Sequence, residues 1–156
     1  IGLIENSLPV FGVIYIPITN IAYYNKSSNS AFKIDFNTKI ESQLVKAEKS
    51  ILKSPNEVIV TASSSHITNK TKEYIKDLAP KDVKYISSAI KFCMLADGQA
   101  DIYPCFGKTM EWDTAAGHAI LLSLDGDVID TEGKRLIYGK GNFLNPNFIA
   151  YRSTKN

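Results

Sequence analysis

The chain has 156 residues, of which 44% are hydrophobic, and its formal net charge at pH 7 is +2. This length fits one globular domain, or one domain and part of another. Because the net charge is small and no apolar run has membrane-spanning length, the sequence indicates neither a nucleic-acid polymer as partner nor a transmembrane segment.

Residues 1–40 alternate short apolar runs with polar turns, which is typical of an antiparallel meander. The predicted strands are Gly2 to Glu5, Val10 to Ile16, Ile21 to Asn25 and residues 31–36. Residues 1–40 are therefore expected to form an antiparallel strand segment that belongs to an N-terminal sheet. Because the sequence begins with an apolar run at Ile1 and not with methionine, we also expect that part of the natural protein lies upstream.

Residues 41–56 are rich in lysine and lack a clear period, so they are predicted to connect two structural units. Part of this connector, Glu41 to Leu52, could be helical. Residues 57–156 alternate strand and helix patterns, which predicts an α/β domain with at least partly parallel pairing. Its strands are expected at 57–64, 83–87, 99–104 and 126–130, and its helices at 67–79, 87–98 (with a serine cap) and 111–122.

Asp113 stands at the start of the last predicted helix, in the sequence EWDTAAGHAILL. Two interpretations of this carboxylate are open. It could cap the helix, because it accepts free N–H groups of the first turn and suits the positive end of the helix dipole. Alternatively, it could bind a metal ion. Ala115, Ala116 and Ala119 would let the helix pack closely and hold the carboxylate rigid, as the near-octahedral ligand geometry of Mg²⁺ requires.

Two other predicted helices follow polar strand ends. Ser63 and His66 bracket the sequence SSSH after one strand, and Ser88 follows another strand, with Lys91 one turn into its helix. In open α/β sheets, ligands bind at the carboxyl ends of the strands, where hydroxyls, free N–H groups and lysines can hold phosphate. Each feature alone also fits a helix cap or a solvated side chain. Two such loops beside an acid-bearing helix favour a phosphate-ester site.

Several segments resemble the inositol-monophosphatase superfamily and, within it, the 3′(2′),5′-bisphosphate nucleotidases of the bacterial CysQ type. The sequence WDTAAG at residues 112–117 is similar to the second signature of the family, and KFC, ADGQADIYP, GKRLIY and NFLNPNF match its surroundings. The likeness extends over nearly the whole chain. It implies the C-terminal part of the layered αβαβα sugar-phosphatase fold, with an antiparallel meander followed by a mixed α/β domain.

The resemblance implies a Mg²⁺-dependent phosphatase that hydrolyses adenosine 3′,5′-bisphosphate to AMP and phosphate, with metal-activated water as the nucleophile. It makes Asp113 a metal ligand beside the substrate, and it makes Ser63, His66, Ser88 and Lys91 substrate-binding residues. The alternatives are an inositol-phosphate or sugar-bisphosphate phosphatase of the same superfamily, and a non-catalytic remnant that only binds nucleotide.

The family's first signature, an Asp-Pro-(Ile/Leu)-Asp-Gly-Thr stretch that supplies most of the metal ligands, is absent from the sequence. We therefore expect a fragment without catalytic residues of its own, and with little or no activity alone, because one carboxylate cannot hold a catalytic Mg²⁺. The apolar strand VFGVIYI would be bare without the family's N-terminal helices. The chain is therefore expected to form a homodimer or to pair with a separate N-terminal half.

The expected location is the cytoplasm, with a peripheral position at the inner membrane as the alternative. Cys93 and Cys105 match no metal-binding spacing and are expected to be free thiols in a reducing compartment.

Overall fold

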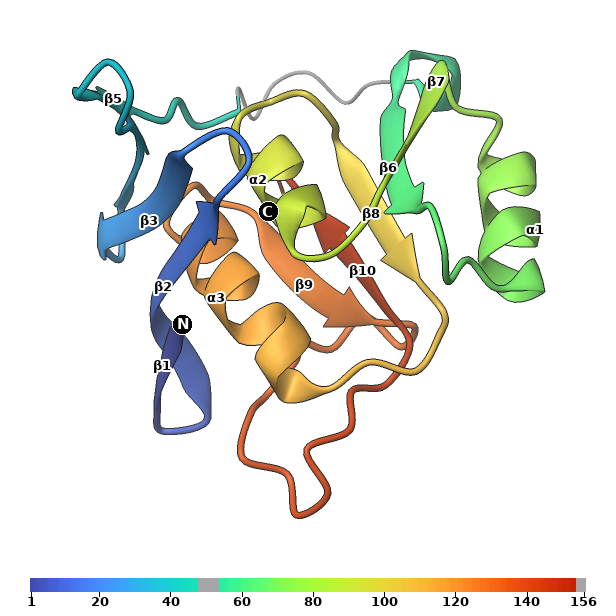
Figure 1. Ribbon diagram of the computed structural model, residues 1–156. Helices are drawn as coiled ribbons and strands as arrows, with labels where there is room; N and C mark the ends of the chain where they lie inside the picture. Colours follow the sequence, from blue (N-terminus) through green and yellow to red (C-terminus); the bar gives the residue numbers. More distant parts are fainter. Residues whose placement is uncertain (48–53, 154–156) are drawn as a thin grey trace.

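The computed structural model describes residues 1–47 and 54–153, which form two five-stranded sheets and three α-helices (Figure 1). The first sheet has the order β1-β2-β3-β4-β5, and the second has the order β7-β6-β8-β10-β9. This arrangement confirms the predicted fold class. The strands are β1 (Gly2–Glu5), β2 (Leu8–Ile16), β3 (Ile21–Ser27), β4 (Ser30–Asp35), β5 (Ile40–Gln43), β6 (Ile59–Ser63), β7 (Asp82–Ile86), β8 (Ile102–Cys105), β9 (Asp127–Asp130) and β10 (Phe148–Tyr151), and the helices are α1 (Asn69–Leu78), α2 (Ile90–Ala96), α3 (Glu111–Leu122) and the short 3-10 helix η1 (Pro55–Glu57).

The first sheet is an antiparallel meander, as predicted, with each strand paired to the next along the chain. Asn6 and Ser7, between β1 and β2, both have positive φ angles, 50° and 63°. Positive φ at both central residues is the backbone of a type I′ hairpin turn, whose twist matches that of the flanking strands. The polar pair that marks this turn in the sequence therefore sets the register of the first hairpin.

The helix considered for Glu41 to Leu52 is wrong in the part that the structure describes. Residues Ile40–Gln43 form β5, which pairs with β4 and extends the meander to a fifth strand. All four residues of β5 are exposed, so this edge strand carries no apolar alternation by which the sequence could reveal it. Residues 48–53 of the predicted connector lie outside the described residues.

The second sheet is mixed, which confirms the prediction of partly parallel pairing. Strand β6 pairs in parallel with both β7 and β8, whereas β10 is antiparallel to β8 and β9. The strand β10 was not predicted, because its four residues follow a long loop and are too few to show a period. Antiparallel β10 does not interrupt the parallel set of β7, β6 and β8, which is the part that positions the candidate site.

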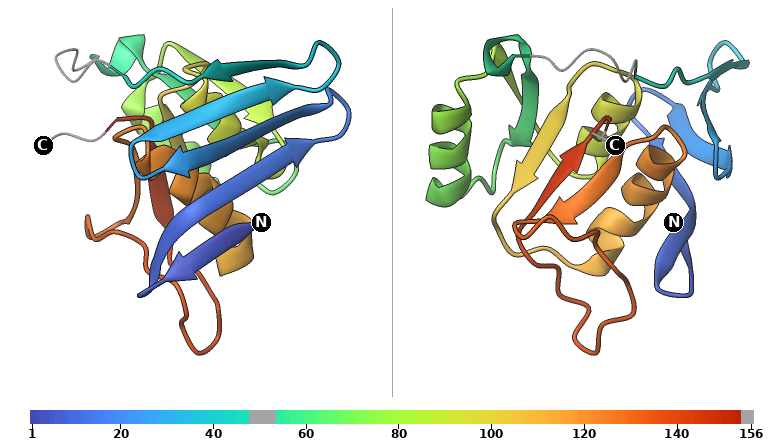
Figure 2. Two further views of the ribbon diagram at one scale, coloured as in Figure 1. Left: turned by 90° about the vertical axis from the view of Figure 1, so that its left-hand side faces the viewer. Right: turned by 180° about the vertical axis from the view of Figure 1, so that it is seen from behind.

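Helices α2 and α3 lie between the two sheets, and α1 covers the opposite side of the second sheet (Figure 2). Successive side chains of β6 point to opposite faces of the sheet, which explains this layering. Val60 and Ala62 pack with Ile75 of α1 on one face, whereas Ile59 packs against the main core on the other. The main core joins Ile14 of the first sheet to residues of α2, α3 and the second sheet. No helix in the described part of the chain has the length and apolar character needed to span a membrane.

Glycines allow α3 to approach its neighbours closely. A Cβ atom on Gly12 of β2 would lie 2.1 Å from the carbonyl oxygen of Ala116, and one on Gly117 would lie 2.1 Å from the ring of Phe92 in α2. Both separations are far below a normal contact distance, so neither position can hold a larger residue without movement of the backbone. The close packing of this helix, expected from its alanines, is therefore confirmed, with glycine at the two tightest points.

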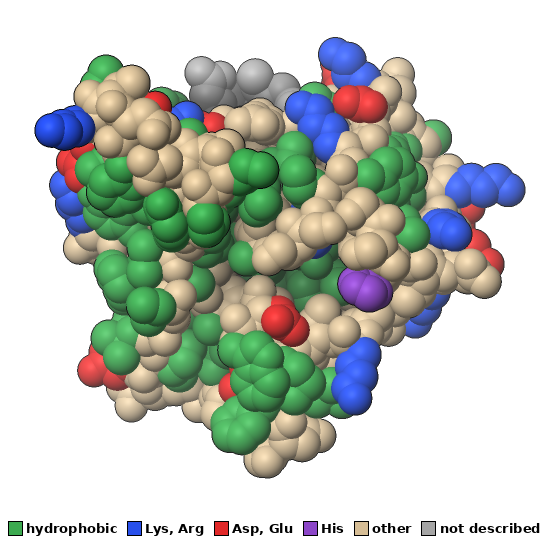
Figure 3. All heavy atoms as spheres, in the orientation of Figure 1, with side chains coloured by type: hydrophobic (Ala, Val, Ile, Leu, Met, Phe, Trp, Pro, Cys, Tyr) green, Lys and Arg blue, Asp and Glu red, His purple; other side chains and the backbone are tan. Residues whose placement is uncertain are grey.

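The face of the first sheet that points away from α3 is also apolar. Residues that pair directly across strands share a face, and Val13, Tyr15, Ala22, Tyr24, Phe32 and Ile34 pair in this way. Figure 3 shows hydrophobic side chains gathered on the side of the molecule where β1, β2 and β3 lie. A shallow groove of about 490 Å³ lies on this outer face, lined by Val13, Tyr15, Asn20, Ala22 and Phe36.

Candidate functional site

Three loops meet at one edge of the second sheet. Because β7, β6 and β8 are parallel, their carboxyl ends lie at the same edge, with Ser63 opposite Ile86 in the register of β6 and β7. Each of these strands leads through a short loop into a helix, to α2, α1 and α3 respectively. The sequence-predicted site residues Ser63, Ser88 and Asp113 follow or end these strands, so the topology brings their segments together.

Hydrogen bonds tie these loops to one another. The hydroxyls of Ser64 and Ser87 are 2.6 Å apart, which joins the loop after β6 to the loop after β7. The hydroxyl of Thr68, the N-cap of α1, donates to the carbonyl of Phe106 at 3.2 Å, which joins the loop after β6 to the loop after β8. The hydroxyl of Ser63 accepts the backbone N–H of His66 at 3.1 Å and so closes a local turn.

Ser88 has a left-handed backbone, with φ at 63°. Helix α2 does not have the predicted serine cap, because Ala89 is its N-cap residue and makes no side-chain cap bond. The ammonium group of Lys91 instead donates to the carbonyl of Ser88 at 2.8 Å and, more weakly, to that of Ile86 at 3.4 Å. An ammonium has three N–H groups, and within residues 1–47 and 54–153 two carbonyls accept from this one.

Lys91 is buried, with 4% of its surface exposed, and its Nζ lies 4.9 Å from the centre of the Tyr103 ring. Burial lowers the pKa of Lys91, while the charges of Cys105 and Asp113 act in the opposite direction. Asp113 is thus within electrostatic reach of Lys91. The structure therefore brings the lysine of one predicted loop and the acid of another to the same region.

Asp113 is the third residue of α3, and its side chain is exposed. Its Oδ2 accepts the backbone N–H of Met110 at 2.8 Å, so the carboxylate does cap the helix start, although Met110 and not Asp113 is the N-cap residue. Within residues 1–47 and 54–153, the structure gives Oδ1 no hydrogen bond or ion pair. One oxygen of the carboxylate is thus held in place by the helix start.

The described residues do not by themselves fit a Mg²⁺ ion. In this part of the chain, no group of three or more His, Cys, Asp or Glu side chains could hold a metal. Asp113 offers one unused oxygen, whereas Mg²⁺ takes six oxygen ligands in near-octahedral geometry. A metal at Asp113 would need most of its ligands from water, from a bound phosphate or from residues outside the described part of the chain.

Helix α3, which carries Asp113, also contributes to a buried polar network that the sequence analysis did not predict. His118, which is fully buried, bonds through Nδ1 to the Tyr138 hydroxyl and through Nε2 to Asp127, both at 2.9 Å. Burial lowers the pKa of His118 and outweighs the opposing effect of Asp127. The spacing of Glu111, Thr114 and His118 could have indicated this polar stripe on one face of the helix.

The comparisons with known proteins agree with this architecture. The inositol monophosphatase family model matches residues 1–156. The 3′(2′),5′-bisphosphate nucleotidase CysQ of Salmonella typhimurium is 38% identical over 149 residues, which cover 95% of this chain and 57% of the relative. The crystal structure of CysQ from Bacteroides thetaiotaomicron aligns with a TM-score of 0.82 and 33% identity, covering 99% of this chain and 61% of that one.

A structure of SaIMPase-II with inositol monophosphate bound has a TM-score of 0.75 at 18% identity and covers 99% of this chain and 56% of that one, so it shares the fold. The chain therefore spans a little over half the length of the curated relatives that it matches.

Proposed function

Because the chain belongs to the inositol monophosphatase family, we propose that it is the nucleotide-binding part of a Mg²⁺-dependent 3′(2′),5′-bisphosphate nucleotidase. The proposed reaction is the hydrolysis of adenosine 3′,5′-bisphosphate to AMP and phosphate. Ser63, His66, Ser88 and Lys91 would bind the nucleotide, and Asp113 would contribute one oxygen to a metal centre completed from outside this chain. Alone, the chain would bind the nucleotide and have little or no phosphatase activity.

The observation that carries this proposal is the meeting of three loops at the carboxyl ends of β6, β7 and β8. Hydroxyls of two loops are bonded to each other, and a buried ammonium lies within electrostatic reach of the exposed carboxylate of the third. A phosphate ester needs hydroxyl and cationic donors for its oxygens. A carboxylate beside these donors repels a phosphate unless a cation lies between them, which favours a metal-assisted reaction.

When bound, a Mg²⁺ ion would neutralise phosphate charge and activate water. The chain's own residues would bind the nucleotide and hold Asp113 in place. Lys91 would hold a non-scissile phosphate, and its buried position keeps water from competing for the ammonium. The helix start at Met110 would hold Asp113 through Oδ2. The single available oxygen supports the proposal of inactivity, because most ligands of the ion would have to come from elsewhere.

Isothermal calorimetry of the purified chain with adenosine 3′,5′-bisphosphate, with and without Mg²⁺, tests this proposal. We expect saturable binding that is weakened at least tenfold by Lys91→Met, since a charge-assisted hydrogen bond contributes roughly 1.5–3 kcal/mol. Lys76→Met, exposed in the last turn of α1 at the end away from the three loops, is the matched control and should have little effect. Stronger binding of inositol phosphates than of the nucleotide would favour the alternative substrate class. Rapid Mg²⁺-dependent turnover by the chain alone would refute its inactivity.

A second part of the proposal concerns a protein partner. The outer face carries Tyr15 and Phe36, which are 50% and 47% exposed and meet edge to face. An apolar sheet face of this kind seldom stays in contact with water. We propose that it is covered either by a second copy of the chain or by a separate N-terminal half. Sedimentation should show association that Tyr15→Ser weakens, and a clean monomer at micromolar concentration would contradict it.

A further inference from the structure

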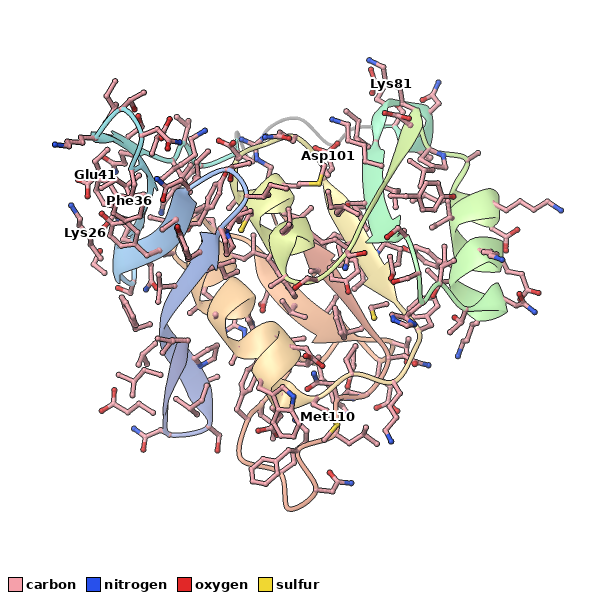
Figure 4. The ribbon with its side chains drawn as sticks, viewed as in Figure 1. Lys26, Phe36, Glu41, Lys81, Asp101 and Met110 are labelled. Atoms are coloured by element: carbon pink, nitrogen blue, oxygen red, sulfur yellow. The ribbon has the colours of Figure 1, made fainter. Side chains whose placement is uncertain are left out.

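The loop that joins β9 to β10 is attached to the start of α3. The backbone N–H of Glu111 donates to the carbonyl of Phe143 at 2.8 Å, and Met110 and Leu144 form an isolated β-bridge. The Glu111 carboxylate also accepts the backbone N–H groups of Gly139 and Lys140. Figure 4 shows Met110 at this junction, between the lower end of α3 and the loop. The first turn of α3 is therefore held by residues from a distant part of the sequence.

Asn145 makes the most central of these contacts. Its side chain is 6% exposed, and its Nδ2 donates to the carbonyl of Met110 at 2.7 Å. The same amide nitrogen lies 3.1 Å from the hydroxyl of Thr114 and 3.3 Å from that of Thr109. The backbone N–H of Asn145 donates to the carbonyl of Thr109 at 2.9 Å. A single residue thus binds the carbonyls on both sides of Met110.

This arrangement fixes the group that orients Asp113. The carbonyl of Thr109 and the N–H of Met110 belong to the same planar peptide group. The backbone N–H of Asn145 holds that carbonyl, and its side-chain amide holds the carbonyl of Met110, which belongs to the next peptide group. The two bonds limit rotation of the Met110 backbone on both sides, and the N–H of Met110 donates to Oδ2 of Asp113. The placement of the Asp113 carboxylate then depends on a residue 32 positions later.

We propose that Asn145 is a positioning residue for Asp113. It does not touch the ligand. Its side-chain amide acts by holding the carbonyl of Met110 and by contacting the hydroxyls of Thr109 and Thr114, which fixes the backbone at Met110 and hence the N–H that binds the carboxylate. The inference rests on the proposed function, because it assigns Asn145 a role in the same nucleotide site. Loss of one or two hydrogen bonds of ordinary strength predicts a roughly 3- to 10-fold rise in the Kd for adenosine 3′,5′-bisphosphate measured in Mg²⁺ buffer.

A double-mutant cycle separates this role from a merely structural one. The Kd is measured for the wild-type chain, Asn145→Ala, Asp113→Ala and the double variant. We expect Asn145→Ala to change the Kd in the wild-type background but not in the Asp113→Ala background. Asn142→Ala is the matched control and should leave the Kd unchanged. Asn142 lies in the same loop, and among the described residues its side chain makes one hydrogen bond, in which Oδ1 accepts the backbone N–H of Leu144. Asn145→Ser, which keeps a shorter donor, replaces the alanine variant if that variant does not fold.

Amide hydrogen exchange gives a second readout that needs no ligand. If Asn145 orients the peptide group, the N–H of Met110 should exchange faster in Asn145→Ala, while amides in the middle of α3 keep their protection. The same loss of affinity in both backgrounds, or unchanged exchange at Met110, would overturn the inference. If the wild-type chain binds no bisphosphate, the proposed function fails, and exchange at Met110 alone decides whether Asn145 holds the Asp113 carboxylate.

Discussion

Replacement of Gly12 by alanine should damage the contact between the first sheet and α3 more than the same change at Gly2, the other glycine of that sheet. The new Cβ would lie 2.1 Å from the carbonyl oxygen of Ala116 and 2.8 Å from two further backbone atoms of that residue. None of these atoms is the end of a flexible side chain, so relief requires movement of the strand or of α3 by more than an ångström. We therefore expect the upper part of the usual range for overpacking, about 3 kcal/mol.

Thermal and urea unfolding can measure this effect. For a chain of this size, about 3 kcal/mol corresponds to a fall in Tm of roughly 6–12 °C. Gly141→Ala is the matched control, because no atom lies within 4 Å of its added Cβ. It should change the stability by less than about 0.5 kcal/mol. Equal stability of Gly12→Ala and Gly141→Ala would refute the close approach of the strand and the helix, and with it the rigid support of Asp113.

Three further predictions concern the site loops, the buried network and the junction of the layers. Ser88→Gly should leave the free energy of unfolding unchanged or slightly higher, because glycine adopts a positive φ without strain. Ser87→Gly should lower it by about 1 kcal/mol, because it removes the hydrogen bond to Ser64. A Ser88→Gly variant that is less stable than Ser87→Gly would contradict the loop geometry.

Burial lowers the pKa of His118 in the folded chain, whereas histidine in the unfolded chain titrates at about 6.5, so the unfolded chain binds more protons as the pH falls below that value. The stability contributed by neutral His118 is therefore complete above about pH 6.5 and is lost at lower pH. Urea unfolding from pH 7.5 to 5 should show this loss of stability, and His118→Gln should reduce the dependence of stability on pH. Tyr23→Phe should cost about 1 kcal/mol in the same assay by removing the 3.1 Å bond to Asp97, and an unchanged midpoint would show that this link between the layers contributes nothing.

Short-range patterns were sufficient to predict most of the elements. β1 and α3 have the predicted bounds, because a polar turn limits the first and an acid-bearing start defines the second. The resemblance on WDTAAG and its surroundings is confirmed at the level of the family. The two serine-bearing loops were also predicted to follow strand ends, since serine-rich segments after β-branched runs have a simple physical meaning. The assignment of nucleotide contacts to Ser63, His66, Ser88 and Lys91 stays a prediction.

The errors have a common cause. The strand β5 is exposed and four residues long, so only its pairing with β4 makes it a strand. Helix α2 starts without a serine cap because the backbone of Ser88 is left-handed and Ala89, which has no side-chain acceptor, is the N-cap residue. The contact of Asn145 with Met110 spans 35 positions and leaves no periodic trace. In each case, the deciding contact or backbone angle is not part of the local residue pattern from which the element was predicted.

By itself, the sequence determined the class of fold, the family and the residue types at the strand ends. The periodicity of hydrophobic residues, the turn residues and the residues of the family motif are local properties of the chain, so they can be identified without the structure. Only the tertiary structure decided that Asp113 caps its helix through the N–H of Met110 without being the N-cap residue, and its assignment as a metal ligand stays a prediction. The physical reason is that the direction of a side chain depends on the peptide groups around it, and here those groups are held by residues that only folding brings near.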